Sequence, residues 1–424
     1  MGVESSMANN NSEKELLKKY LGKELSGFLF EDDDVEILSR TSDVGGEGTL
    51  DKNLDLAVVA KNTIKTRKVM TPREMVKELD KTVIGQDATK KVLAVEFYKH
   101  IMRIKNKEKL EFLDKNIKKS NILLTGKSGC GKTFICEELS RILGIDCLIY
   151  DTSALTSSGY VGKSVEDIFN DLIVKCERNL ERIENAVIVL DEIDKKRSHS
   201  SERDTADVAG SKVVMEMLKM LEGTEMNVKG ITINTKNILF IGCGSFMGTS
   251  EDSSIEEVVR RRLKEGKKVE ESYSIGFGRT AKSKTPVKEL TDEECRSQIT
   301  KTDIVAWGML PELVGRFDIV SNLKSLTIED YINIAKNRIE SIDDNNGLFD
   351  LLDKKLTVKE EVVEAIANKA FRDRDMGARI INGIFSEIIS NVIYEIEDEI
   401  AEYIVDLEYI EKLGIIEKES EEEA

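Results

Sequence analysis

One octapeptide constrains the fold of this chain more than any other segment. Residues 126–133 have the sequence Gly-Lys-Ser-Gly-Cys-Gly-Lys-Thr, which matches the pattern G-x-x-x-x-G-K-[ST] of a phosphate-binding loop. The small residues of such a loop let backbone N–H groups turn inward around the phosphates of a nucleotide. An apolar segment precedes the octapeptide at 122–124, and residues with helical spacing follow it at 134–143. A strand, a loop and a helix in this order predict an α/β protein that binds a nucleoside triphosphate.

The same loop predicts which residues bind the nucleotide and its metal ion. Lys132 is expected to reach the β- and γ-phosphates, and the Thr133 hydroxyl is expected to contact Mg²⁺. The backbone of the whole loop would surround the phosphates. The candidate cofactor-binding residues here are Gly126, Lys127, Ser128, Gly129, Cys130, Gly131, Lys132 and Thr133.

A second segment addresses hydrolysis rather than binding. Residues 186–194 have the sequence Ala-Val-Ile-Val-Leu-Asp-Glu-Ile-Asp, an apolar run that ends in acids. Such a strand would deliver Asp191 to the metal, largely through water, and Glu192 to the attacking water, which it would orient and polarise. The alternative is a helix N-terminus decorated with acidic residues. Because five apolar residues directly precede the acids, the pattern favours an ATPase.

Composition limits the other functions. The net charge is −17 and 34% of residues are charged, which disfavours a nucleic-acid-binding surface. The six cysteines form no C-x-x-C pair and only two histidines accompany them, so no zinc site is expected. No apolar run approaches the roughly 20 residues that a membrane span needs. A cytoplasmic protein with no membrane segment is expected.

The chain is expected to divide into four stretches. Residues 1–68 are polar and irregular and would form an arm, possibly disordered, or a small domain. Residues 69–320 alternate apolar strands, expected at 121–125, 147–150, 186–190 and 238–242, with helices. This alternation predicts a large domain with a parallel sheet flanked by helices. Residues 321–412 are expected to form a smaller, mainly helical domain, and 413–424 an acidic tail.

Capping boxes mark three helix starts in this division. Thr71 with Glu74, and Pro72 between them, predicts a helix at the beginning of the large domain. Thr327 with Asp330 predicts a second. The third prediction is a capping box of Thr357 with Glu360 in the helical C-terminal part.

Several motifs occur together in one known family. Besides the phosphate loop and the acidic strand, they are Val-Ile-Gly-Gln at 83–86, Pro-Glu-Leu-Val-Gly-Arg at 311–316 and Gly-Ala-Arg at 377–379. With these motifs the chain, from about residue 71 to about 395, resembles the AAA+ ATPases of the Clp/Hsp100 kind. The resemblance implies a large P-loop ATPase domain, a small helical AAA+ domain, the cofactors ATP and Mg²⁺, and a homo-oligomeric ring, most readily a hexamer.

The resemblance also implies roles for residues outside the phosphate loop. Val83 and Ile84 would line the adenine pocket, and Arg379 would link nucleotide state to the angle of the small domain. Arg316 would be the arginine finger, which reaches the γ-phosphate bound by the neighbouring subunit and neutralises charge on the transferred group.

The residue that monitors the γ-phosphate after the strand at 238–242 is left open between Ser245 and Cys243.

Two loops connect the resemblance to protein substrates. Tyr160 and Val161 lie between small residues and align with a pore loop that grips polypeptide, although such a loop is otherwise a turn with a half-buried ring. Ile275, Gly276 and Phe277 match a tripeptide that docks on a ClpP-type peptidase. The alternative for this tripeptide is a small apolar cluster that packs on its own domain.

One departure and three functional readings remain. No cysteine precedes Cys130, so the N-terminal zinc-binding domain of the relatives is absent or replaced by residues 1–68. The favoured reading is an unfoldase that delivers proteins to a ClpP-type peptidase. The others are a protease-independent remodeller or an HslU-like protease ATPase, and a nucleic-acid-handling protein or a scaffold without turnover. The net charge of −17, with Glu192 and Arg316, disfavours this last reading.

Overall fold

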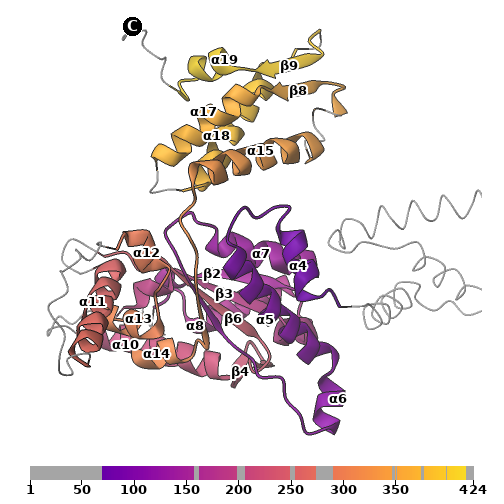
Figure 1. Cartoon of the computed structure of the whole chain (residues 1–424). Coiled ribbons are helices and arrows are strands. Elements are labelled where there is room, and N and C mark those ends of the chain that lie inside the picture. Colours follow the sequence, from indigo (N-terminus) through magenta and orange to yellow (C-terminus); the bar gives the residue numbers. More distant parts are fainter. Residues whose placement is uncertain are drawn as a thin grey trace, which may run out of the picture.

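The computed structural model describes residues 69–156, 162–197, 206–248, 254–273, 290–345, 349, 351–373, 377–397 and 399–416. A five-stranded sheet with helices on both faces is followed by a C-terminal part of helices and one strand pair (Figure 1). The described residues contain no helix long and apolar enough to cross a membrane.

The central sheet has the strand order β2-β3-β6-β1-β7, and every neighbouring pair is parallel. Its strands are β1 (Ile122–Thr125), β2 (Cys147–Asp151), β3 (Val187–Asp191), β6 (Leu239–Gly244) and β7 (Ile319–Asn322). The four strands expected from sequence are present, and β7 is an additional one. Because all five run in the same direction, their carboxyl ends meet at one edge of the sheet, which we call the carboxyl edge. The opposite edge is called the amino edge.

Successive residues of the central strands point to opposite faces, and each face is covered by its own apolar cluster. In β1, Leu123 packs in one cluster, while Ile122 and Leu124 pack in the other. The helices of the second cluster, on the right of Figure 1, are α4 (Pro72–Leu79), α5 (Asp87–Lys105) and α7 (Lys132–Leu143). The main helices of the first cluster are α8 (Val165–Lys175), α10 (Ala206–Glu222), α11 (Ile255–Tyr273), α13 (Lys301–Trp307) and α14 (Pro311–Gly315). The sheet is therefore buried on both faces, which confirms the predicted α/β class.

Shorter elements complete this region. They are α6 (Lys107–Phe112), the 3₁₀ turn η2 (Thr152–Ala154), α9 (Leu180–Glu184), the 3₁₀ turn η3 (Ile193–Lys196), the antiparallel pair β4 (Glu225–Val228) and β5 (Ile231–Asn234), and α12 (Asp292–Arg296).

The C-terminal part has its own apolar cluster and a parallel strand pair. Its elements are α15 (Ile328–Asn345), β8 (Lys355–Val358), α17 (Glu360–Arg372), α18 (Arg379–Tyr394), β9 (Glu402–Val405) and α19 (Leu407–Lys412). This part is mainly helical, as expected, and the strand pair is an addition. The exact division of the chain into domains stays a prediction, and residues 1–68 lie outside the described ranges.

Two of the three predicted capping boxes are confirmed and one is wrong. Thr71 and Glu74 exchange both capping hydrogen bonds at the start of α4. At the start of α15 the Thr327 backbone donates to Asp330 at 2.8 Å, and the Asp330 backbone donates to Thr327 at 3.2 Å. Thr357 instead lies inside β8, where its hydroxyl donates to Glu402 of β9. Because this β-branched residue pairs with β9, it belongs to a strand and does not cap α17, whose N-cap residue is Lys359.

Candidate nucleotide site

The phosphate loop leaves β1 at the carboxyl edge and leads into α7. The Gly126 backbone donates to the carbonyl of Gly244 at the end of β6, with an N···O distance of 3.3 Å. Gly131 precedes α7 with φ of +95°, which a residue with a Cβ adopts only under strain. The eight predicted loop residues thus lie together between a buried strand and a helix N-terminus.

Lys132 has a buried ammonium group whose hydrogen-bond partners are neutral. Its Nζ donates to the carbonyls of Gly126 at 2.8 Å and Lys127 at 2.9 Å. Lys132 is 9% exposed, and within the described ranges no carboxylate forms an ion pair with it. A buried cation without an anionic counterpart is unfavourable unless an anion binds beside it. The loop therefore fits a nucleotide phosphate.

The acidic strand end lies directly against the phosphate loop. The Thr133 hydroxyl donates to Asp191 Oδ2 at 2.9 Å, which brings together the two residues predicted to hold the metal. Hydroxyl and carboxylate oxygens are the ligands that Mg²⁺ prefers. Glu192 is exposed and has a left-handed φ of +53°. Because such a backbone costs about 1–3 kcal/mol in a non-glycine residue and clusters at functional sites, it supports a chemical role for Glu192.

The loop after β6 lies between the phosphate loop and the acidic motif. Asp194 Oδ2 accepts hydrogen bonds from the Ser245 hydroxyl at 3.1 Å and from the Phe246 backbone at 3.0 Å. Cys243, the other candidate for a γ-phosphate monitor, is fully buried in the apolar cluster beneath α7. The geometry therefore favours Ser245, which is half-buried at the strand end.

The run at 83–86 contacts the phosphate loop, and the adenine pocket of Val83 and Ile84 stays a prediction. Val83 is buried and packs in the apolar cluster with α4, whereas Ile84 is half-buried and remains available to a ligand. Gln86 donates through Nε2 to the carbonyls of Cys130 at 3.3 Å and Lys324 at 2.8 Å. Sequence reasoning missed Gln86, although it closes the Val-Ile-Gly-Gln motif. It joins the phosphate loop to the segment that leads into α15.

The C-terminal part also reaches the phosphate loop. Gly377 has φ of +62°, and a Cβ at this position would lie 2.6 Å from the Cα of Gly129. Only glycine allows so close an approach. Arg379 begins α18 two residues later with an exposed side chain, so the N-terminus of this helix, with its partial positive charge, lies close to the loop.

Arg316, by contrast, lies at the amino edge. Its carbonyl accepts a hydrogen bond from Asn121 Nδ2 at 3.0 Å, just before β1 begins. The length of β1 separates this point from the phosphate loop of the same chain, about 13 Å at roughly 3.3 Å per residue. The Arg316 guanidinium forms an ion pair with Glu222, and the two side chains are 42% and 46% exposed. The structure does not bring Arg316 to its own nucleotide site.

The two predicted substrate and docking loops lie outside the described residues. Tyr160 and Val161 belong to the segment 157–161, and Ile275, Gly276 and Phe277 belong to 274–289. The first segment is flanked by a bridge between Leu155 and Lys163, and the second follows α11.

Comparison with known proteins agrees with this geometry. Residues 117–320 match the family model described as AAA domain (Cdc48 subfamily). The chain is 33% identical over 362 residues to the ATP-dependent Clp protease ATP-binding subunit ClpX of Bacteroides thetaiotaomicron, and the alignment covers 82% of each chain. The fold and the site define an ATP-binding P-loop ATPase of the AAA+ class. Within this class, the chain belongs to the ClpX family of Clp ATPases.

Proposed function

We propose that this ATPase is a protein unfoldase, which works as a homohexameric ring and delivers unfolded polypeptide to a ClpP-type peptidase. The relative in Bacteroides thetaiotaomicron is named as the ATP-binding subunit of an ATP-dependent protease. The observation that carries the proposal is the position of Arg316. It lies at the amino edge, away from the phosphate loop of its own chain, with a half-exposed guanidinium. An arginine in this position can instead contact the nucleotide bound to a neighbouring subunit.

The residues of the carboxyl edge would divide the chemistry of hydrolysis. Lys132 binds the phosphates, and Glu192 orients the attacking water and accepts its proton. Thr133 and Asp191 would hold Mg²⁺, which would neutralise charge on the phosphate oxygens. Arg316 of one subunit stabilises the charge that develops on the γ-phosphoryl group of the next.

The loops outside the described ranges would handle protein. Tyr160 and Val161 grip the substrate in the axial channel, because an aromatic ring holds a polypeptide by area and shape without requiring a sequence. Ile275, Gly276 and Phe277 dock in an apolar pocket of the peptidase, as two apolar side chains on either side of a glycine can.

A single assay separates this function from its alternatives. The Glu192→Gln variant is first used to capture a bound protein, and the unstructured tail of that protein is fused to a folded fluorescent protein. The fusion is then incubated with the purified chain, ATP, Mg²⁺ and a ClpP-type peptidase. We expect ATP-dependent loss of fluorescence together with peptide products. Loss of fluorescence without peptides would indicate a protease-independent remodeller. ATP turnover without loss of fluorescence would contradict the unfoldase.

Two sets of variants test the loops separately. Tyr160→Ala should leave ATP turnover largely intact while slowing unfolding, and Tyr160→Phe, which keeps the ring, should unfold normally. Equal loss of both activities in Tyr160→Ala would contradict the pore role. The variant Ile275→Ala, Phe277→Ala should fail to retain the peptidase in a pull-down, and unchanged retention would contradict docking.

A further inference from the structure

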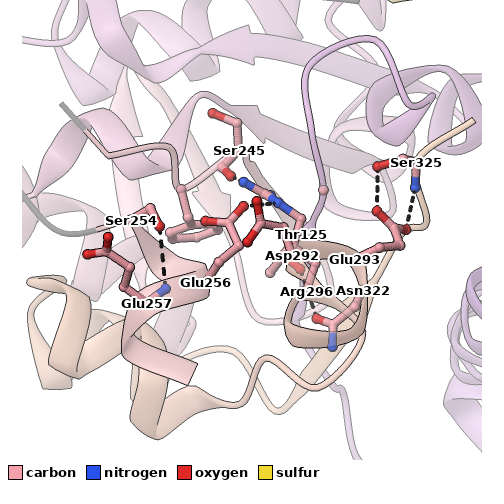
Figure 2. Close-up of polar contacts among 12 residues, drawn as sticks. Thr125, Ser245, Ser254, Glu256, Glu257, Asp292, Glu293, Arg296, Asn322 and Ser325 are labelled. Carbon is pink, nitrogen blue, oxygen red and sulfur yellow. Dashed lines mark hydrogen bonds and ion pairs between the residues drawn. The ribbon is translucent and has the colours of Figure 1, made fainter. Parts of the chain in front are cut away.

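A buried ion pair joins α11 and α12 beside the nucleotide site. Arg296, the last residue of α12, pairs through Nε with Glu256 of α11, and the two side chains are 4% and 9% exposed (Figure 2). A second pair, Arg260 with Asp292, crosses the same two helices one turn away, and its side chains are 23% and 65% exposed. The Arg260–Asp292 pair, which is more exposed to solvent, therefore already joins the two helices. Burying charge is costly, and apolar residues of similar volume are often as stabilising, so the buried pair needs another reason.

The remaining contact of Arg296 supplies that reason. Its Nη1 donates to the carbonyl of Ser245 at 3.0 Å, in the loop after β6. Gly244, the last residue of β6 and the neighbour of Ser245, accepts the backbone N–H of Gly126 in the phosphate loop. The loop also donates twice to Asp194, two residues after Glu192. Arg296 thus holds a loop that contacts both the phosphate loop and the acidic motif.

The helix that carries Arg296 is itself fixed at the carboxyl edge. Glu293 accepts hydrogen bonds from the Ser325 backbone at 2.8 Å and the Ser325 hydroxyl at 2.6 Å. Asn322, at the end of β7, donates to the carbonyls of Ser297 and Ile299 just after α12, both at 3.1 Å. Figure 2 shows the two contacts between Glu293 and Ser325, with Asn322 beside Arg296. The helix that carries Arg296 is therefore held at both of its ends, and the guanidinium is buried between Glu256 and the Ser245 carbonyl.

We propose that Arg296 is a positioning residue of the nucleotide site. Arg296 holds the Ser245 carbonyl and thereby fixes residues 244–246 between the phosphate loop and the acidic motif that contains Glu192. Glu256 keeps the guanidinium oriented and compensates its charge. In this proposal Arg296 acts through the loop and not on the nucleotide itself. It sets the place of the Ser245 hydroxyl and of Asp194, and through them the geometry in which the γ-phosphate is held. The inference rests on the ATPase part of the proposed function and is independent of unfolding.

The test uses the full-length chain and separates positioning from stability. Arg296→Met alone leaves Glu256 as an uncompensated buried charge and is expected to lower the thermal midpoint. The double variant Arg296→Met, Glu256→Met removes both charges and should recover that midpoint. The matched control is Arg260→Met, which removes the more exposed ion pair between the same helices.

The readouts are kcat and KM for ATP, and the dissociation constants of ADP and of a non-hydrolysable ATP analogue. In the double variant we expect kcat to fall about tenfold, ADP affinity to stay within twofold, and the preference for the ATP analogue over ADP to fall about tenfold. Such a factor corresponds to about 1.4 kcal/mol, one good hydrogen bond to a charged group. Arg260→Met should behave as wild type.

A double variant with the thermal midpoint, kcat and nucleotide preference of wild type would overturn the proposal and leave the pair a structural one. The same would follow if ADP and ATP-analogue affinities fell together. Absence of turnover in the wild type would refute the ATPase instead, and the nucleotide preference would still decide the role of Arg296.

Discussion

The two edges of the central sheet carry polar groups of opposite character. At the carboxyl edge, the ammonium group of Lys132 is buried without a carboxylate partner among the described residues, and Thr133 donates to Asp191. At the amino edge, the buried ring of His100 has its partner within the chain, since Nε2 donates to the Asn185 carbonyl at 2.8 Å, whereas Arg103 Nε and Asn121 Oδ1 are buried without a hydrogen-bond partner in the part of the chain that the structure describes. We therefore expect the amino edge mainly to support the fold and the carboxyl edge to perform the chemistry.

Arg316 is the exception that makes the comparison informative. It belongs to the amino edge by position, yet its half-exposed guanidinium meets only a half-exposed Glu222 among the ion pairs described. The carboxyl edge of one chain holds what is needed to bind ATP, and we infer that efficient hydrolysis needs the amino edge of a second.

The largest expected effect comes from removing Arg316. Arg316→Ala should lower kcat about 10³-fold, because an arginine finger contributes at least this much to transition-state stabilisation. Nucleotide affinity should change little, since Arg316 lies away from the phosphate loop of its own chain. Steady-state ATP turnover and binding of a fluorescent ADP analogue measure the two quantities.

Mixing two inactive variants tests whether this arginine acts between subunits. In rings assembled from Arg316→Ala and Glu192→Gln subunits, some interfaces combine an intact nucleotide site with an intact arginine from the neighbour. We expect turnover to reappear on mixing. Additive, near-zero activity at every mixing ratio would contradict the shared site and, with it, the distinction between the two edges.

Glu192→Gln should have the second-largest effect. Without a carboxylate to accept the proton of the attacking water, kcat should fall about 10²-fold or more, in the range of a lost general base. ATP should remain bound, because the phosphate-binding residues are unchanged. The matched control is Glu181→Gln, an exposed glutamate of α9 near the amino edge. Single-turnover hydrolysis of bound ATP measures the effect. A wild-type rate in Glu192→Gln would show that Glu192 is not the general base.

The structural character of the amino edge can be measured through His100. Burial, with Arg103 nearby, lowers its pKa from 6.5 to about 3. Above pH 6.5 the ring is neutral in both states and its contribution to stability is complete. As the pH falls below 6.5 the unfolded chain takes up a proton that the folded chain refuses, so stability is lost progressively toward pH 3.

The expected loss between pH 7 and pH 5 is about 2 kcal/mol in the free energy of unfolding from this residue alone. His100→Gln is the control, because an amide can donate to Asn185 and accept from Arg103 without titrating. Urea unfolding at both pH values gives the difference between the two proteins. An identical pH dependence in wild type and variant would show that His100 charges freely in the folded state.

The two edges also differ in how far sequence reasoning reaches. The phosphate loop and the acidic strand end are contiguous patterns, so their strand, loop and helix could be predicted with their residues. Thr357 was assigned to a helix cap because a local pattern cannot register its strand partner Glu402. β7 was missed because its four residues, Ile-Val-Ser-Asn, are short and half polar.

Contacts between distant segments could not be predicted at all. Gln86 and Lys324 are 238 residues apart, and Arg296 and Ser245 are 51 apart. Neither pair has a spacing that repeats in a helix or strand, and both exist only once the sheet has brought their segments together. The strand, loop and helix of the phosphate loop were therefore predictable, while the contacts between distant segments around them were not.

The smallest expected effect belongs to Glu222, the partner of Arg316 within the chain. In a ring, a guanidinium that reaches a neighbouring nucleotide has to leave this carboxylate, so the ion pair competes with catalysis. Because the pair is about half exposed, solvent screening limits it to less than about 1 kcal/mol. Glu222→Gln should therefore raise kcat by about twofold at low salt, and the difference should fade as the ionic strength rises. Glu225→Gln, a nearby exposed glutamate of β4, is the control. A decrease of kcat in Glu222→Gln would mean that the carboxylate orients Arg316 toward the neighbouring subunit instead of competing with that subunit's nucleotide for the guanidinium. The amino edge would then hold Arg316 in a catalytic orientation as well as supply its side chain.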